Sequence, residues 1–253
     1  MKEYLAERLI QVWAQLFQCT TDSFRLKPSS PNGPRQRAEI CKKLEFVEQQ
    51  ANILGLRSTA QGAVRLQQQM TLIKPDKIPA AIQSLNERFH DDIVGLVFLY
   101  LPTEKRSYHN RTDLFGETFK ANFPAANSEV IEAGNCFSLG RNTACVFHLM
   151  RSLEVVLKAL FAALGLPPLT SAGERNWNGI LSKIKGHLDV NKKSLPDFDF
   201  YDGAYAFLAA AKNPIRNATM HVDATYDEDG ARTVFDAVGA FMRHVATKLK
   251  DST

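Results

Sequence analysis

The chain has 253 residues, enough for one large domain or two small ones with a sizeable core. Hydrophobic residues make up 45% of it and charged residues 23%, which is the composition of an ordinary soluble globular protein. The formal net charge of +4 is compatible with a nucleic-acid partner but is too small to argue for one.

The four cysteines, Cys19, Cys41, Cys136 and Cys145, form no CxxC pair, and no histidine follows at zinc-finger spacing. They predict reduced, partly buried thiols in a cytoplasmic protein. Charged residues interrupt the apolar N-terminal stretch, so it does not predict a signal peptide. No stretch is apolar for long enough to span a bilayer, and we expect no contact with a membrane.

The first half of the chain predicts four helices, because apolar residues recur there at helical spacing. The segments cover roughly residues 5–16, 35–54, 59–73 and 78–89. Gly55 is expected to stop the second of them. The run that follows, IVGLVFLYLP, has the β-branched and aromatic content of a short strand, but it could equally be the buried end of the fourth helix. Periodicity does not decide between the two.

Residues 102–127 have little sustained pattern and predict a boundary between a helical N-terminal region, 1–120, and a second domain, 121–253. Phe115, Phe119 and Phe123 are expected to pin this connector onto one of the cores.

The second half is more regular and predicts a helical bundle. Helices are expected over residues 128–140, 142–164, 177–188, 199–215 and 225–245. The helix over 142–164 is apolar nearly all round, which is typical of a helix in the middle of a bundle. Asp199 is a candidate N-cap, and Thr225-x-x-Glu228 has the spacing of a capping box. The predicted fold class is therefore mainly all-α, with at most one short strand.

The joint between the last two helices carries an arginine and a histidine five residues apart, Arg216 and His221, with Asn217 directly after the arginine. Arginine offers a planar, permanently charged group that fits phosphate, and histidine exchanges a proton near neutral pH. These are the groups that cleave a phosphodiester without a metal. On one continuous helix the two side chains would lie roughly 140° apart, so they meet only if the helix ends between them or if two motifs face each other in a dimer.

Two stretches of the second half, CFSLGRNTACVFHLMRSLE (136–154) and KNPIRNATMH (212–221), resemble the HEPN superfamily. Members are α-helical bundles, usually dimeric, and many are metal-independent RNases of toxin–antitoxin, abortive-infection and CRISPR-linked systems. Their signature is an arginine, a polar residue, a few more residues and a histidine, which Arg216, Asn217 and His221 match at the short end of its spacing. The resemblance covers roughly residues 128–250 and leaves the first half without a functional assignment.

The helix over 142–164 also carries polar residues, His148, Arg151 and Glu154. In a structural interpretation Arg151 pairs with Glu154, and Glu154 with Lys158 one turn on. In a functional interpretation Glu154 or Arg151 orients Arg216 and His221. The sequence favours neither.

The resemblance implies an endoribonuclease with RNA as substrate, no cofactor and no metal. The 2′-hydroxyl of RNA would attack the phosphodiester, His221 would act as general acid or base, and Arg216 would stabilise the charge on the phosphate. It also implies a homodimer, and a toxin or antiphage-defence effector held in check by a regulatory protein or by sensing. The alternative is a catalytically inactive HEPN-type module that binds a nucleotide, RNA or protein. An arginine and histidine five apart also occur by chance, as a helix-end cation and a hydrogen-bonded loop residue.

Overall fold

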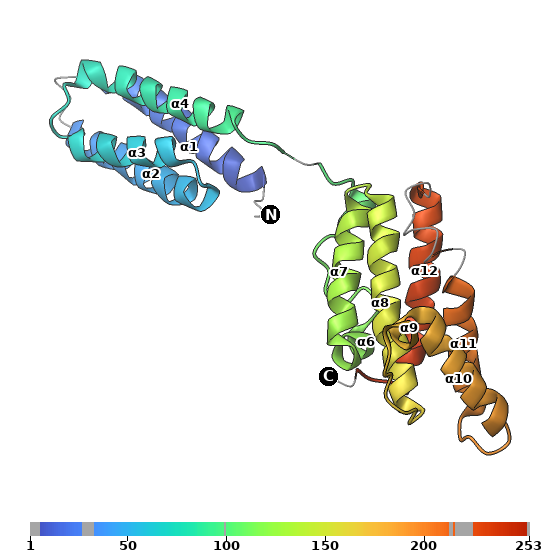
Figure 1. Ribbon diagram of the computed structural model, residues 1–253. Helices are drawn as coiled ribbons and strands as arrows, with labels where there is room; N and C mark the ends of the chain where they lie inside the picture. Colours follow the sequence, from blue (N-terminus) through green and yellow to red (C-terminus); the bar gives the residue numbers. More distant parts are fainter. Residues whose placement is uncertain (1–5, 27–32, 99, 213–214, 216–224, 252–253) are drawn as a thin grey trace. The chain divides into compact units, whose positions relative to one another are not determined.

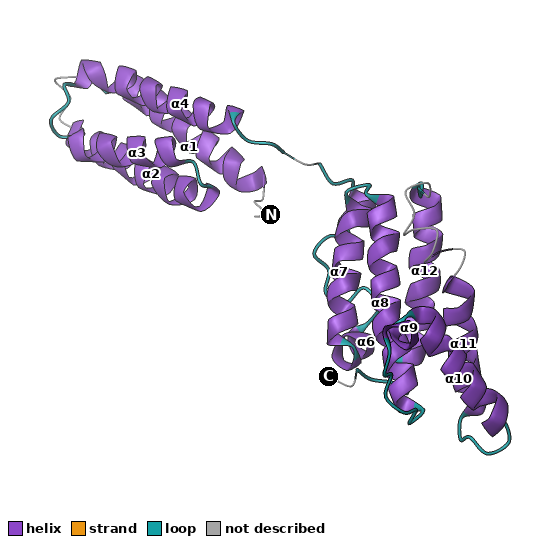
Figure 2. Ribbon diagram, in the orientation of Figure 1, coloured by secondary structure: helices purple, strands orange, loops and turns teal. Residues whose placement is uncertain are grey.

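The computed structural model describes residues 6–26, 33–98, 100–212, 215 and 225–251. Every regular element in these ranges is a helix, which confirms the predicted all-α class (Figure 2). The chain forms two compact units, residues 1–99 and 100–253. The division lies just before the segment 102–127, in which the sequence places the boundary.

The first unit is a bundle of four helices, each packed against two of the others (Figure 1). Its elements are α1 (Ala6–Phe24), α2 (Gly33–Leu54), α3 (Arg57–Gln69), the 3₁₀ turn η1 (Pro75–Lys77) and α4 (Ile78–Val94). The four helices share one continuous apolar core, to which they contribute Val12, Leu44, Ala63 and Ile82 respectively. α2 ends where predicted, because Gly55 adopts a left-handed φ of 77° that other residues rarely take.

The segment after α4 forms neither of the structures that the sequence allowed. α4 ends at Val94, and the described residues between Gly95 and Pro102 are loop. Val97 and Phe98 are exposed. A β-branched and aromatic run is stable as a strand only when it pairs with another strand, and the described residues contain none.

The second unit is built around α8 (Asn142–Ala163), which packs against α7, α10, α11 and α12 (Figure 1). Eleven of its described side chains are buried, as its apolar sequence predicts. The other elements of this unit are α5 (Thr103–Arg106), α6 (Glu117–Asn122), α7 (Pro124–Ser138), α9 (Ala172–Arg175), α10 (Trp177–Asn191), α11 (Phe198–Ala211) and α12 (Glu228–Val245). No helix in the described ranges combines the length and apolarity that a membrane span requires.

The connector packs onto the core of the second unit through its phenylalanines, as expected. Phe115, Phe119 and Phe123 are all at most 2% exposed, and the rings of Phe115 and Phe235 lie 5.2 Å apart edge to face. The connector also lies close against α7, where a Cβ on Gly134 would come within 2.6 Å of the carbonyl oxygen of Tyr108.

The predicted capping box of α12 does not form. The N-cap is Asp227, whose Oδ1 accepts a hydrogen bond from the backbone N–H of Gly230 at 2.8 Å. The helix therefore begins two residues later than a cap at Thr225 requires. Glu228 is the first residue of the helix rather than the third, as a capping box requires, and its carboxylate pairs with Lys105 Nζ at 2.6 Å.

The predicted cap of α11 is also wrong. The N-cap position is occupied by Asp197, which has a left-handed φ of 57° and makes no side-chain cap. Its carboxylate instead pairs with Lys248. Asp199 lies inside the first turn, where a negative charge is favourable at the positive end of the helix dipole.

Candidate functional site

The three residues of the proposed catalytic motif, Arg216, Asn217 and His221, lie outside the described residues. The structure does describe the chain on both sides of them. α11 ends at Ala211 and α12 begins at Glu228, and both helices pack against the buried α8.

The upstream side of the motif is joined to the second unit by one polar and one apolar contact. Lys212 Nζ donates a hydrogen bond to Oδ1 of Asn178, at the start of α10, at 2.6 Å. Ile215 is half-buried against the apolar core of the unit. The arginine of the motif is the next residue in the chain.

The downstream side is fixed to the beginning of α8. The backbone N–H of Tyr226 donates to Thr143 Oγ1 at 3.0 Å, and the tyrosine side chain packs against the core. α8 and α12 therefore begin at the same end of the bundle, side by side (Figure 1). In the sequence, the motif lies between the last residue of α11 and the first residue of α12.

A charged cluster that the sequence did not predict lies at the start of α12. Glu228 pairs with Lys105 at 2.6 Å and with Arg232 at 3.7 Å, and the Arg232 guanidinium lies 5.1 Å from the ring centre of Phe137. The hydrogen bond from Lys105 lowers the pKa of Glu228 below its ordinary value. With Asp227 and Asp229, which flank Glu228, the start of α12 carries three carboxylates beside these two cations. The i, i+4 spacing of Glu228 and Arg232 is visible in the sequence, but Lys105 lies 123 residues away and nothing local indicates it.

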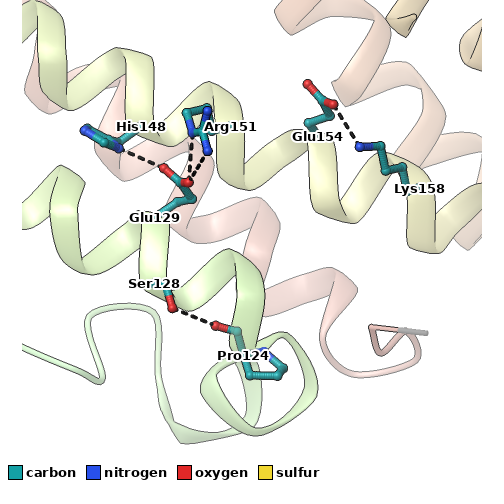
Figure 3. Close-up of polar contacts among 7 residues, drawn as sticks. All are labelled: Pro124, Ser128, Glu129, His148, Arg151, Glu154 and Lys158. Carbon is teal, nitrogen blue, oxygen red and sulfur yellow. Dashed lines mark hydrogen bonds and ion pairs between the residues drawn. The ribbon is translucent and has the colours of Figure 1, made fainter. Parts of the chain in front are cut away.

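Two of the three predicted supporting residues meet on a carboxylate from the neighbouring helix. Figure 3 shows Glu129 of α7 accepting from both His148 and Arg151 of α8. The Glu129 oxygens lie 2.8 Å from His148 Nδ1 and 2.8 Å from an Arg151 guanidinium nitrogen. Glu129 was missed because the pairing depends on the register between two helices, which neither sequence segment encodes alone.

The third supporting residue, Glu154, makes a separate pair with Lys158, Nζ to Oε1 2.9 Å, as the structural interpretation predicted (Figure 3). The pairing of Arg151 with Glu154 is not the one that forms, because Glu129 offers Arg151 a closer partner. Arg151 and Lys158 are exposed, so α8 has a polar strip along one side and is not apolar all round. How these groups lie relative to Arg216 and His221 falls outside the described residues.

The ionisation of Glu129 is set by two opposing effects. Burial disfavours its charged form, but the hydrogen bonds from Arg151 and His148 outweigh that cost, so the pKa of Glu129 lies below its ordinary value. Glu129 is therefore an anion near neutral pH, and it holds the two basic side chains of α8 in place.

Within the described part of the chain, no group of three or more His, Cys, Asp or Glu side chains is arranged to hold a metal ion. All four cysteines are free thiols. Comparison of the chain with protein-family models, with curated proteins and with solved structures gives no match in any of the three.

Proposed function

We propose that the second unit is a HEPN-type helical bundle and that the protein is a metal-independent endoribonuclease. The observation that supports the proposal is the place of the motif in the sequence, between two helices of the second unit. Arg216, Asn217 and His221 lie in the segment that joins α11 and α12, and both of these helices pack on the central α8. Of the described residues on either side of the motif, Ile215 and Tyr226 are packed against the core of the second unit.

The proposed reaction uses the RNA 2′-hydroxyl as its nucleophile. His221 takes the proton of that hydroxyl as the oxygen attacks phosphorus, the bond from phosphorus to the 5′-oxygen breaks, and a second acid protonates the leaving oxygen. The products are a 2′,3′-cyclic phosphate and a 5′-hydroxyl. Arg216 binds the phosphate and stabilises the charge that develops on its oxygens, and Asn217 donates a hydrogen bond that positions the phosphate or His221.

One motif supplies one histidine, whereas the reaction uses a base and an acid. We therefore infer a homodimer in which the segment 198–221 of each chain belongs to the interface, because a two-fold axis brings two motifs together. Full nuclease activity in a protein that sediments as a monomer at micromolar concentration would contradict this inference.

The test compares a defined single-stranded RNA with the all-deoxy strand of the same sequence, both in EDTA. We expect cleavage of the RNA, fragments that end in a 2′,3′-cyclic phosphate, and an intact DNA strand, because DNA lacks the nucleophile. Arg216→Lys should restore little of the activity lost in Arg216→Ala, since an ammonium cannot reproduce a two-pronged phosphate contact. RNA cleavage that disappears on addition of EDTA would rule out the metal-independent reaction.

The biological setting follows from the same resemblance and is part of the proposal. A ribonuclease of this kind would act as a toxin or antiphage effector controlled by a regulatory protein. RNA that binds but stays uncut in EDTA would instead identify a binding module in which Arg216 serves as a phosphate clamp.

A further inference from the structure

The first helix of the first unit exposes an apolar stripe that its own fold does not use. Ile10, Trp13, Phe17 and Phe24 on α1 are 63%, 58%, 61% and 74% exposed. With Thr21 they follow a spacing of three, four, four and three residues, which places all five within about 80° on one side of a helix. We name these five residues the α1 stripe. The stacked rings of Trp13 and Phe17, 5.8 Å apart, lie within it.

The opposite side of α1 already supplies the contacts that fold the first unit. Val12, Leu16 and Cys19 are at most 1% exposed and belong to the core that α1 shares with α2 and α4. The stripe is therefore additional apolar surface. Exposed apolar patches of this kind on a single chain commonly mark an interaction site.

The stripe also lacks the charges that cover the neighbouring helices. None of residues 9–21 is charged, whereas the exposed positions of α2 and α4 include Glu39, Lys42 and Glu87. Depletion of charge together with enrichment of tryptophan and phenylalanine is the composition of the buried centre of a protein interface.

We propose that the α1 stripe is a homodimer interface in which α1 of one chain packs antiparallel against α1 of a second copy. The stripe is symmetric about Phe17: Ile10 and Phe24 each lie seven residues from it, and Trp13 and Thr21 each lie four residues from it. A two-fold axis through Phe17 consequently places Ile10 opposite Phe24 of the partner subunit, and the largest side chain, Trp13, opposite the small Thr21 of the partner subunit. Large side chains facing small ones are what interdigitation requires.

Polar groups along the stripe favour the same orientation. Thr21 donates its hydroxyl proton to the carbonyl oxygen of Phe17 at 3.1 Å, so the hydroxyl needs no new partner when it is buried. Glu7 is exposed at one end of α1 and Arg25 is exposed just beyond the other end. Antiparallel packing brings the two opposite charges together, whereas parallel packing would bring like charges together.

The size of the stripe suits a dimer. The four large side chains expose on the order of 500 Å² per chain, because a whole aromatic side chain offers about 200 Å². Two copies would bury about 1,000 Å² through the stripe alone, which is where specific interfaces begin.

The native tryptophan reports on the stripe directly. In a full-length Trp177→Phe protein, Trp13 is the only tryptophan. We expect its emission to be blue-shifted at tens of micromolar and to move to the red on dilution, as the indole becomes exposed to water. Phe17→Glu places two carboxylates on the axis and should weaken association at least about a hundredfold, giving red-shifted emission at every concentration. Leu72→Glu, at an apolar position 83% exposed elsewhere in the same unit, should leave the transition unchanged.

A disulfide measurement tests the orientation. Cys41 and Cys136 are replaced by alanine in the full chain, and circular dichroism checks that each variant is folded. Mild oxidation of a mixture of Ile10→Cys and Phe24→Cys proteins should give a cross-linked pair of one chain of each. Cross-linking of Ile10→Cys with itself would show a parallel arrangement and overturn the proposal.

Concentration-independent, water-exposed Trp13 emission up to 100 µM would also overturn the proposal, and so would a blue shift of Trp13 that appears only on addition of neutral lipid vesicles. None of these measurements involves RNA, Arg216 or His221. Failure of the α1 interface can therefore be distinguished from failure of the proposed function.

Discussion

At the scale of single residues, Glu129 is the side chain whose contribution can be measured most cleanly. It is a mostly buried carboxylate with two basic partners, whereas Glu154 makes one exposed i, i+4 pair on the same side of the bundle. Glu129→Gln should lower the free energy of unfolding by about 1 kcal/mol at pH 7, because charge-assisted hydrogen bonds are the stronger class. Glu154→Gln should change it by less than about 0.5 kcal/mol. Urea unfolding followed by circular dichroism measures both.

The Glu129 effect has a defined pH dependence. The pKa of Glu129 is lower in the folded protein than the ordinary value of about 4.3, so the stabilisation is complete above that pH and is lost as the pH falls below it. The stability difference between the Glu129→Gln variant and the wild type should therefore shrink below about pH 4. A difference that does not shrink at all as the pH falls below 4 would show that packing, rather than the charge, is responsible.

The four thiols should fall into two classes of reactivity. Burial raises the pKa of Cys19 and of Cys145 to about 12, whereas Cys41 and Cys136 are only half-buried. The thiolate is the reactive form, so iodoacetamide at pH 8 should label the buried pair at least about tenfold more slowly. Mass spectrometry of timed samples measures the four rates, and all four should become equal in urea. Equal labelling of Cys145 and Cys136 in the folded protein would contradict the burial of Cys145.

At the scale of elements, the start of α12 distinguishes the observed cap from the expected one. Asp227→Ala removes the hydrogen bond to the Gly230 N–H and should cost about 1 kcal/mol of stability. Thr225→Ala should cost less than about 0.5 kcal/mol, because Thr225 is exposed and does not cap the helix. Thermal unfolding of the two single variants compares them. A larger loss in Thr225→Ala would restore the capping box that the sequence suggested.

The helices were predictable where one local property determines them. The three-to-four-residue spacing of apolar side chains located α2, α4, α8 and α10 to within a few residues, because the side of a helix that faces a core must be apolar whatever it packs against. The end of α2 was equally local, since only the glycine readily adopts the left-handed conformation at position 55.

What the sequence could not supply depends on residues far apart in the chain. Glu228 pairs with Lys105, which lies 123 residues away in the chain. Arg151 pairs with Glu129 rather than with Glu154 because α7 and α8 pack in one particular register. The motif of Arg216, Asn217 and His221 could be proposed from the sequence because its three residues lie within six positions. The contacts of the described residues on either side of it, Lys212 with Asn178 and Tyr226 with Thr143, join distant segments and could not be predicted.

At the scale of the whole molecule, the two proposals assign different tasks to the two units. The first unit would join two chains through the α1 stripe, and the second would carry the catalytic motif. Joining two chains raises the effective concentration of one second unit around the other, which favours the pairing of motifs that the acid–base chemistry uses. Loss of the stripe by Phe17→Glu should then weaken RNA cleavage most strongly at low protein concentration.

The most direct test of the central claim is RNA cleavage in EDTA by the His221→Ala protein, with His90→Ala as its matched control. His90 is an exposed histidine on α4, so its replacement removes the same chemical group while keeping Arg216, Asn217 and His221. We expect His221→Ala to lower the cleavage rate on the order of a hundredfold or more, since general acid–base catalysis is lost, and His90→Ala to cleave like the wild type. Both variants should keep the wild-type circular dichroism spectrum. Wild-type cleavage by folded His221→Ala protein would contradict the account.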